Sequence, residues 1–283
     1  MLKRVLVVLA LGLAVVTAWW GLRLYQNHLA LEAKLALIVT TRPVDVVDCS
    51  SFTSQRPLVL LALGQSNAGN HGTLSASADA PIWMMTGAYC LQANDPLPGA
   101  TGTGGSIWRH LPAMLGSELG GRKVVLSVLA VDATSIDDWV RPGSAVGQRL
   151  AGQVRELQRR GLSPDFVLWQ QGEADARNGT SASQYLNGLQ KLASLLEKAG
   201  THAPLLLARS TVCRSEPSKM IRSAIDSATQ TNPHFVAGPN TDLLQGDAYR
   251  HDGCHFNEVG QRAAARDWAA ALKPLIVTLA VAR

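Results

Sequence analysis

Two distant stretches of the sequence hold side chains that together could carry out nucleophilic catalysis. Ser66 stands in a Gly-Gln-Ser-Asn sequence that directly follows an apolar run, residues 58–63. Asp252 and His255 stand three residues apart, just before a helical pattern near the C-terminus. Attack by a serine hydroxyl needs a base that takes its proton and an acidic group that orients the base. Asp252 can hold Nδ1 of His255 while Nε2 faces Ser66, so these residues are candidates for acyl transfer.

A third stretch could stabilise the negative charge that acyl transfer develops. Residues 169–175 read Trp-Gln-Gln-Gly-Glu-Ala-Asp and end a strand pattern. The neutral side-chain amide of Gln171 can donate to an oxyanion, and Glu173 is predicted to be buried and to shape the turn. Each stretch alone has a plainer explanation, with Ser66 or Asp252 as a helix N-cap. Their combination favours catalysis.

The residues that position these groups alternate between strand and helix patterns. We predict strands at residues 58–63, 123–131, 165–169, 205–208 and 234–237, and helices at residues 106–119, 144–160, 181–198, 217–229 and 257–272. This alternation predicts an α/β fold, a three-layer α/β/α sandwich with a five-stranded, mainly parallel sheet. Such sheets place their chemistry beyond the carboxyl ends of the strands. Residues 69–105 lack periodicity and are predicted to form a long loop.

Composition excludes some functions and predicts two disulfides. The net charge of +5 is scattered, with no basic stripe, so nucleic-acid binding is not expected. Zinc-type cysteine spacing is absent. The four cysteines suit an oxidising compartment and allow three pairings. We favour Cys49–Cys90, which would hold the long loop, and Cys213–Cys254, which would join the loop after strand 205–208 to the loop that carries His255.

The N-terminus has the pattern of an export segment. Lys3 and Arg4 precede an uncharged, mostly apolar run, residues 5–22, which ends at paired tryptophans and an arginine. We therefore predict a transmembrane anchor over residues 1–25, in the inner (cytoplasmic) membrane, with the catalytic domain on the periplasmic or other extracytoplasmic side. The alternative is a secreted protein cleaved after Ala18. Residues 26–56 are predicted as a helical stalk and linker, and residues 57–283 as the main domain.

In their order along the chain, the three stretches resemble the motifs of the SGNH hydrolases. The most similar branch is that of the sialate O-acetylesterase-like carbohydrate esterases, whose blocks read GQSN, WxQGExD and DxxH. The resemblance covers residues 57–272 and implies a flavodoxin-like sheet. It also implies that Ser66 is the nucleophile, His255 the general base and Asp252 its orienting acid. The side-chain amide of Gln171 and the backbone amide of Ser66 would bind the oxyanion.

One block departs from the family pattern. After the second strand the family usually has Gly-Gly-Thr-Ser-Ile, and this chain has Asp132 and Ala133 in place of the two glycines. The family takes its second oxyanion amide from this turn, which makes Ala133 the candidate here. An L-residue can present that amide only from a φ/ψ region open to it. An Asp132 carboxylate aimed at the pocket would oppose the oxyanion.

These observations predict an exported, membrane-anchored serine esterase that removes O-acetyl groups from a carbohydrate and needs no metal or organic cofactor. Two alternatives stay open: an O-acetyltransferase acting on a periplasmic glycan, and a catalytically inactive carbohydrate-binding protein. The candidates for substrate contact are Gln65, Asn67, Trp108 and Trp139, with Trp83 as a further sugar platform.

Overall fold

The central strands of the sheet are apolar throughout. In the computed structural model, which describes residues 2–40, 46–74, 82–87 and 89–282, β2 (Leu58–Gly64) and β5 (Val124–Ala130) are buried along their whole length. They pair in parallel, and β6 (Phe166–Gln170), β7 (Leu205–Arg209) and β8 (Phe235–Asn240) continue the parallel sheet beyond β2. A strand covered on both faces has no polar side, which explains the unbroken apolar runs. All five predicted strands are confirmed.

The sheet has eight strands, not the predicted five. Its order is β1-β4-β3-β5-β2-β6-β7-β8. β3 (Ile82–Thr86) pairs in parallel with β5, and β4 (Tyr89–Ala93) and β1 (Val46–Val47) add antiparallel edge strands. The prediction of a long loop over residues 69–105 was therefore wrong for β3 and β4. Their five-residue patterns are hidden by the flanking glycine, serine and proline residues. The predicted Cys49–Cys90 disulfide is present and ties α2 (Ser50–Thr53) to β4.

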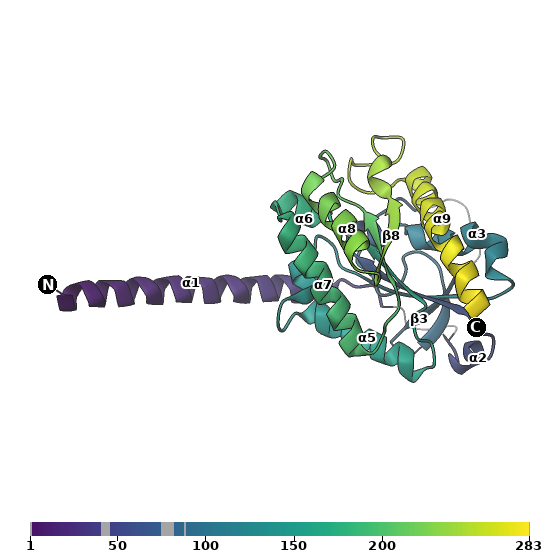
Figure 1. Cartoon of the computed structure of the whole chain (residues 1–283), viewed down its shortest axis with the longest axis horizontal. Coiled ribbons are helices and arrows are strands. Elements are labelled where there is room, and N and C mark those ends of the chain that lie inside the picture. The colour runs from purple at the N-terminus through teal and green to yellow at the C-terminus, as the bar shows by residue number, and fades with distance from the viewer. Residues whose placement is uncertain (1, 41–45, 75–81, 88, 283) are drawn as a thin grey trace.

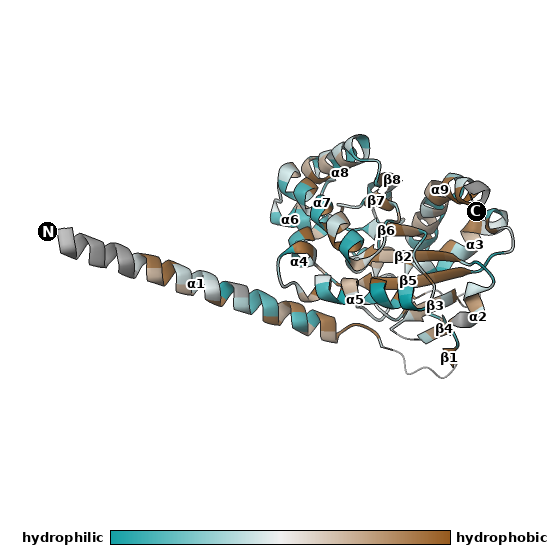
Figure 2. Ribbon diagram, turned by 60° about the horizontal axis from the view of Figure 1, so that its bottom comes forward, coloured by the Kyte–Doolittle hydropathy of each residue, from teal (hydrophilic) through white to brown (hydrophobic). Residues whose placement is uncertain are grey.

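Helices cover both faces of the sheet, as predicted (Figure 1). One face packs against α4 (Ile136–Val140), α5 (Ala145–Arg159), α7 (Ala182–Ala199) and α8 (Lys219–Thr231). The other packs against η2 (Ile107–His110), α3 (Leu111–Leu115) and α9 (Glu258–Ala282). Figure 2 shows the apolar strands between these layers. The helix predicted over residues 106–119 is split into η2, α3 and η3 (Gly116–Leu119). Gly116, with φ 55°, ends α3.

The N-terminal helix α1 (Leu2–Ala36) projects from the sheet and helices in Figure 1. Near its C-terminal end the chain joins the core, where Leu31 and Ile38 are buried. The predicted stalk, residues 26–56, thus contributes side chains to the packed domain. Among the residues that the structure describes, no helix has an apolar stretch that would reach across a bilayer. The side chains of residues 1–11, part of the predicted anchor, lie outside that description.

Candidate active site

The turn after β2 places Ser66 at the carboxyl end of the sheet. Gly64 ends the strand with φ 149°, and a Cβ there would lie 2.1 Å from the carbonyl oxygen of Gln170. Only glycine fits this approach. Ser66 then begins the short turn η1 (Ser66–Ala68). Among the described residues, none accepts a hydrogen bond from the Ser66 backbone N–H, so this N–H can donate to a substrate oxygen.

The loop before α9 holds His255 in one orientation. Nδ1 of His255 lies 2.9 Å from Oδ2 of Asp252. Oδ1 of Asp252 accepts the backbone N–H groups of His255, at 2.7 Å, and of Cys254, at 2.9 Å. Burial favours the neutral carboxyl, but these hydrogen bonds prevail and hold the pKa of Asp252 well below its usual range. Asp252 is therefore a carboxylate that orients the imidazole, and no residue in the described part of the chain is hydrogen-bonded to Nε2.

Asn67 joins the Ser66 turn to the His255 loop. Its Nδ2 donates to Oε1 of Glu173, at 2.8 Å, and to the carbonyl oxygen of Cys254, at 3.1 Å. The residue after Ser66 is thus bonded to the residue before His255. The structure therefore brings together the two stretches that the sequence singled out. Asn67 is buried, as Ser66 is, and it links the two loops; its predicted contact with substrate stays a prediction.

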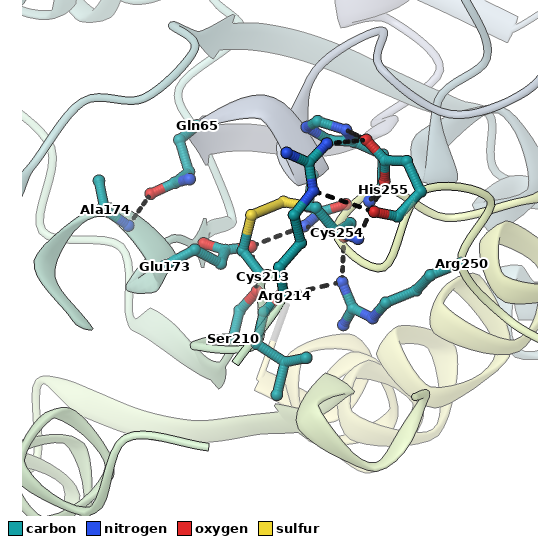
Figure 3. The surroundings of a disulfide bond; sticks show 12 residues. Gln65, Glu173, Ala174, Ser210, Cys213, Arg214, Arg250, Cys254 and His255 are labelled. Carbon is teal, nitrogen blue, oxygen red and sulfur yellow. Dashed lines mark hydrogen bonds and ion pairs between the residues drawn. A yellow bond between two sulfur atoms is a disulfide. The ribbon is translucent and has the colours of Figure 1, made fainter. Parts of the chain in front are cut away.

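The predicted Cys213–Cys254 disulfide is present and connects the loop after β7 to the His255 loop (Figure 3). Next to it, Arg214 reaches back over Asp252. The Arg214 backbone N–H donates to the carbonyl of Gly253 at 2.8 Å, and its Nε donates to the Asp252 carbonyl at 3.1 Å. Its Nη2 lies 3.2 Å from Oδ2 of Asp252. The Cys213–Cys254 disulfide and Arg214 both hold the loop that carries Asp252.

Arg250 supports the His255 loop from inside and was not singled out by any sequence pattern. It is 1% exposed, and its guanidinium lies 4.4 Å from the ring centroid of Phe256. Burial lowers the pKa of Arg250, although nearby carboxylates act to raise it. The guanidinium donates to four backbone carbonyls, those of Thr241, Val212, Leu244 and Cys254. One buried side chain therefore holds three loop segments in place, since Thr241 and Leu244 belong to the same turn.

The turn after β5 keeps a glycine-like backbone although its glycines are replaced. Ala133 has φ 49°, in the left-handed region that costs an L-residue roughly 1 kcal/mol. Its carbonyl accepts a hydrogen bond from Nζ of Lys34, on α1, at 3.1 Å. Ala133 is the second oxyanion donor predicted from the sequence. Its backbone N–H has no acceptor among the described residues and can therefore donate to a substrate oxygen.

Gln171 does not match its predicted role. Its Nε2 lies 2.6 Å from Oδ2 of Asp175, 2.9 Å from the Thr134 carbonyl and 3.3 Å from Oε1 of Gln65. Its Oε1 accepts from the hydroxyl of Tyr185 at 2.8 Å. A side-chain amide has two N–H donors, and both are taken up within this buried network. Gln171 is a structural link between β6 and the turn after β5, and it has no donor left for an oxyanion.

The predicted sugar-binding tryptophans are core residues. Trp108 and Trp139 are 1% and 0% exposed. Their indole N–H groups donate to the Ala68 carbonyl, at 2.7 Å, and to Oγ1 of Thr134, at 3.0 Å. A buried ring cannot stack on a sugar, so this prediction was wrong. Trp83 is partly buried and packs edge-on against Phe52. Buried Gln65 accepts the Ala174 N–H (Figure 3), and its predicted contact with substrate stays a prediction.

Three polar residues from other segments, His71, Thr101 and Asp132, lie near His255. The ring of His71 stacks on that of His255, with centroids 5.3 Å apart and planes at 27°. Oγ1 of Thr101 lies 3.2 Å from Nε2 of His71 and accepts the backbone N–H of Asp132 at 2.9 Å. Burial lowers the pKa of His71, against the nearby Asp132 carboxylate, which raises it.

Comparison with known protein families shows which family this chain belongs to. The profile of the carbohydrate esterases described as sialic acid-specific acetylesterase matches residues 57–273. The chain belongs to this family. It is a carboxylic ester hydrolase. No curated protein matches the chain.

Solved structures show the same fold at low identity. A protein from Arabidopsis thaliana superposes with a TM-score of 0.60 and 18% identity, over 78% of this chain and 98% of its own. A carbohydrate acetylesterase from Xanthomonas citri gives a TM-score of 0.52 and 16% identity, over 78% of this chain and 56% of its own. These likenesses support the three-layer architecture of the esterase.

Glu173 is the structural residue that the sequence predicted. It is 2% exposed, and its Oε1 accepts from Nδ2 of Asn67, at 2.8 Å, and from Oγ of Ser210, at 2.9 Å (Figure 3). Its Oε2 has no partner within the described part of the chain. Burial raises its pKa from 4.5 to about 7, although both hydrogen bonds oppose this. The folded esterase thus binds this proton more tightly than the unfolded chain does.

Glu173 is expected to make the esterase less stable as pH rises. Its contribution to stability is fully present below pH 4.5 and is lost as pH rises to about 7. The loss amounts to at most roughly 3 kcal/mol, since one pKa unit corresponds to about 1.4 kcal/mol. Urea unfolding between pH 4.5 and 8 should show this slope in the wild type and a smaller one in Glu173→Gln. Parallel curves for the two proteins would contradict the assignment.

The two disulfides offer a matched pair for testing the Cys213–Cys254 bond. Each spans 41 residues, so each removes similar entropy from the unfolded chain. Serine pairs at either position should lower the free energy of unfolding by roughly 3 kcal/mol. Only the pair at 213 and 254 should also lower kcat/KM, by roughly 10- to 100-fold, because the His255 loop loses its alignment. Equal kcat/KM for both folded variants would show that this bond does not align the base.

Proposed function

We propose that this esterase hydrolyses O-acetyl groups of a carbohydrate through an acetyl-enzyme formed on Ser66. The observation that carries the proposal is the His255–Asp252 pair, held 2.9 Å apart in a loop that Asn67 ties to the Ser66 turn. A serine, an imidazole and an orienting carboxylate are the parts that acyl transfer needs. All three lie at the carboxyl edge of the sheet, where α/β folds place their sites.

In the first half-reaction, Oγ of Ser66 attacks the ester carbonyl and His255 takes its proton on Nε2. Asp252 stabilises the imidazolium through Nδ1. The oxyanion is bound by the backbone N–H groups of Ser66 and Ala133, both without another acceptor among the described residues. The C–O bond to the sugar then breaks, and His255 returns the proton to the leaving hydroxyl. In the second half, water attacks the acetyl group by the same route, which frees acetate and Ser66.

We further propose that the esterase acts outside the cytoplasm. Two disulfides among four cysteines support this, because such bonds persist in oxidising compartments. The basic residues and apolar run at the N-terminus support its use as an export segment, retained as the anchor over residues 1–25. Protease treatment of spheroplasts should digest a C-terminal tag on the full chain. Protection of the tag until the membrane is broken would contradict export.

The substrate is tested by acetate release from O-acetylated sugars. We would use the full chain, because Leu31 and Ile38 belong to the core. The esterase should release acetate from O-acetylated mono- and oligosaccharides. It should also hydrolyse nitrophenyl acetate faster than nitrophenyl octanoate. Hydrolysis of nitrophenyl acetate but of no acetylated sugar would overturn the carbohydrate assignment. Including an unacetylated acceptor sugar distinguishes transfer from hydrolysis, since only a transferase forms a newly acetylated sugar.

A further inference from the structure

We propose that the opening of the active site binds a divalent transition-metal ion, Zn²⁺ being the best chemical match, through His71, Asp132 and His255, and that the bound ion inhibits the esterase. One ligand atom from each of these side chains lies within 4.8 Å of the other two. The residues come from three segments: the chain after η1, the turn after β5 and the loop before α9. All three are partly exposed, so an ion can reach them from solvent.

The ligand set suits zinc. Two imidazoles and one carboxylate form a recurrent three-residue zinc site that leaves a fourth position for water. The ligand atoms already lie within 4.8 Å of one another, and rotation of the side chains would close them around one ion. The sequence did not suggest this site, because its ligands are far apart along the chain and lack zinc-type spacing.

The surrounding contacts select one nitrogen of each ring. Nδ1 of His255 is held by Oδ2 of Asp252 at 2.9 Å, and Nε2 of His71 lies 3.2 Å from Oγ1 of Thr101. This leaves Nε2 of His255 and Nδ1 of His71 for the ion. A ring held by a carboxylate through one nitrogen while the other binds metal is the usual outer arrangement at zinc sites. Oγ1 of Thr101 also accepts the backbone N–H of Asp132, the third ligand, and so fixes the turn that carries it.

A neighbouring group of residues makes a poorer site and serves as the control. His251, Asp252 and His255 also place ligand atoms within 4.8 Å of one another. The Asp252 carboxylate, however, is already bonded to two backbone N–H groups, to the His255 ring and to Arg214. An ion there would have to break the His–Asp pair. We therefore expect His251 to contribute nothing to zinc binding.

Inhibition follows from the position of the ion on the base. Nε2 of His255 carries the lone pair that takes the proton of Ser66 in the proposed function, on which this part of the inference rests. A metal ion on that lone pair blocks proton transfer without any bond being made or broken in the protein. Removal of the ion by a chelator restores the lone pair and hence the activity.

Calorimetric titration of the full chain with Zn²⁺ tests binding independently of activity. The wild type and His251→Ala should bind one ion per chain with similar affinity. His71→Ala and Asp132→Asn should each bind at least about tenfold more weakly. Co²⁺ in place of Zn²⁺ should give visible absorption bands in the first two proteins. Absence of binding to the wild type, or equal binding by His71→Ala and Asp132→Asn, would overturn the site.

Nitrophenyl acetate hydrolysis in the same samples tests inhibition. Zn²⁺ should inhibit the wild type and His251→Ala, and EDTA should reverse this, whereas His71→Ala and Asp132→Asn should need about tenfold more Zn²⁺. Zinc binding by a chain that hydrolyses no ester would refute the proposed function but support the metal site. Hydrolysis that saturating Zn²⁺ leaves unchanged would refute inhibition and leave the esterase assignment intact.

Discussion

Replacing Asp252 with asparagine is expected to lower kcat/KM for ester hydrolysis by roughly 10³- to 10⁴-fold while the protein stays folded. The asparagine oxygen can still accept the backbone N–H groups of Cys254 and His255. Its amide NH₂ group, however, stands where Oδ2 of Asp252 accepted from Nδ1 of His255, and it can only donate a hydrogen bond to that nitrogen. The ring must then carry its proton on Nε2, the nitrogen that has to take the proton of Ser66. Activity is lost through the wrong tautomer, and the loop keeps its shape.

Arg214→Ala is the matched control for this prediction. It removes the other charged partner of Asp252, at 3.2 Å, but leaves the contact with the His255 ring unchanged. Because Arg214 is 68% exposed on its side chain, its ion pair is weak. We expect a loss of no more than about tenfold in kcat/KM. A value for Asp252→Asn within tenfold of the wild type, in a protein with unchanged thermal unfolding, would contradict the role of Asp252.

Replacing Arg250 with alanine is expected to lower the free energy of unfolding by roughly 3–5 kcal/mol. The four backbone carbonyls that the guanidinium binds would lose a buried donor, and the ring of Phe256 would face a cavity. The His255 loop would loosen with them, so activity should fall together with stability. Lysine has three donors in a compact group and cannot replace the planar fork. Arg250→Lys should therefore regain only part of the lost stability.

Arg266→Ala provides the surface control for Arg250. Its side chain is 67% exposed and pairs with Asp267 on α9. Exposed pairs of this kind contribute about 0–1 kcal/mol. Urea unfolding of the variants at one pH measures both effects. An Arg250→Ala protein within 1 kcal/mol of Arg266→Ala would show that the four carbonyl contacts do not stabilise the fold.

The sequence revealed the elements whose pattern is local. The unbroken apolar runs of β2 and β5 have to be buried on both faces, and Ser181 with Gln184 forms the capping box that begins α7. β3 escaped detection because glycine, serine and proline residues flank its five-residue pattern. What makes β3 a strand is its parallel pairing with β5, a contact between residues about 40 positions apart. No local pattern records such a contact.

The meeting of the candidate catalytic loops could be predicted, because acyl transfer demands particular residue types. Ser66, Asp252 and His255 have few substitutes, and the loops that carry them meet as expected. Trp108 was misassigned because a tryptophan close to a candidate site can be a sugar platform or a core residue. Its indole N–H is satisfied by a backbone carbonyl, that of Ala68, and the sequence gives no sign of this. Arg250 was missed for a similar reason: its partners are backbone carbonyls, which any residue can supply.

Covalent labelling of Ser66 tests the central claim, that this serine forms the acyl-enzyme. The full chain would be treated with a fluorophosphonate, digested and mapped by mass spectrometry, beside Ser66→Ala and His255→Ala. The account predicts one labelled serine, Ser66, with slow labelling of His255→Ala, no label on Ser66→Ala and no acetate release by that variant. Labelling of another serine, or acetate release by Ser66→Ala at the rate of the wild type, would contradict it.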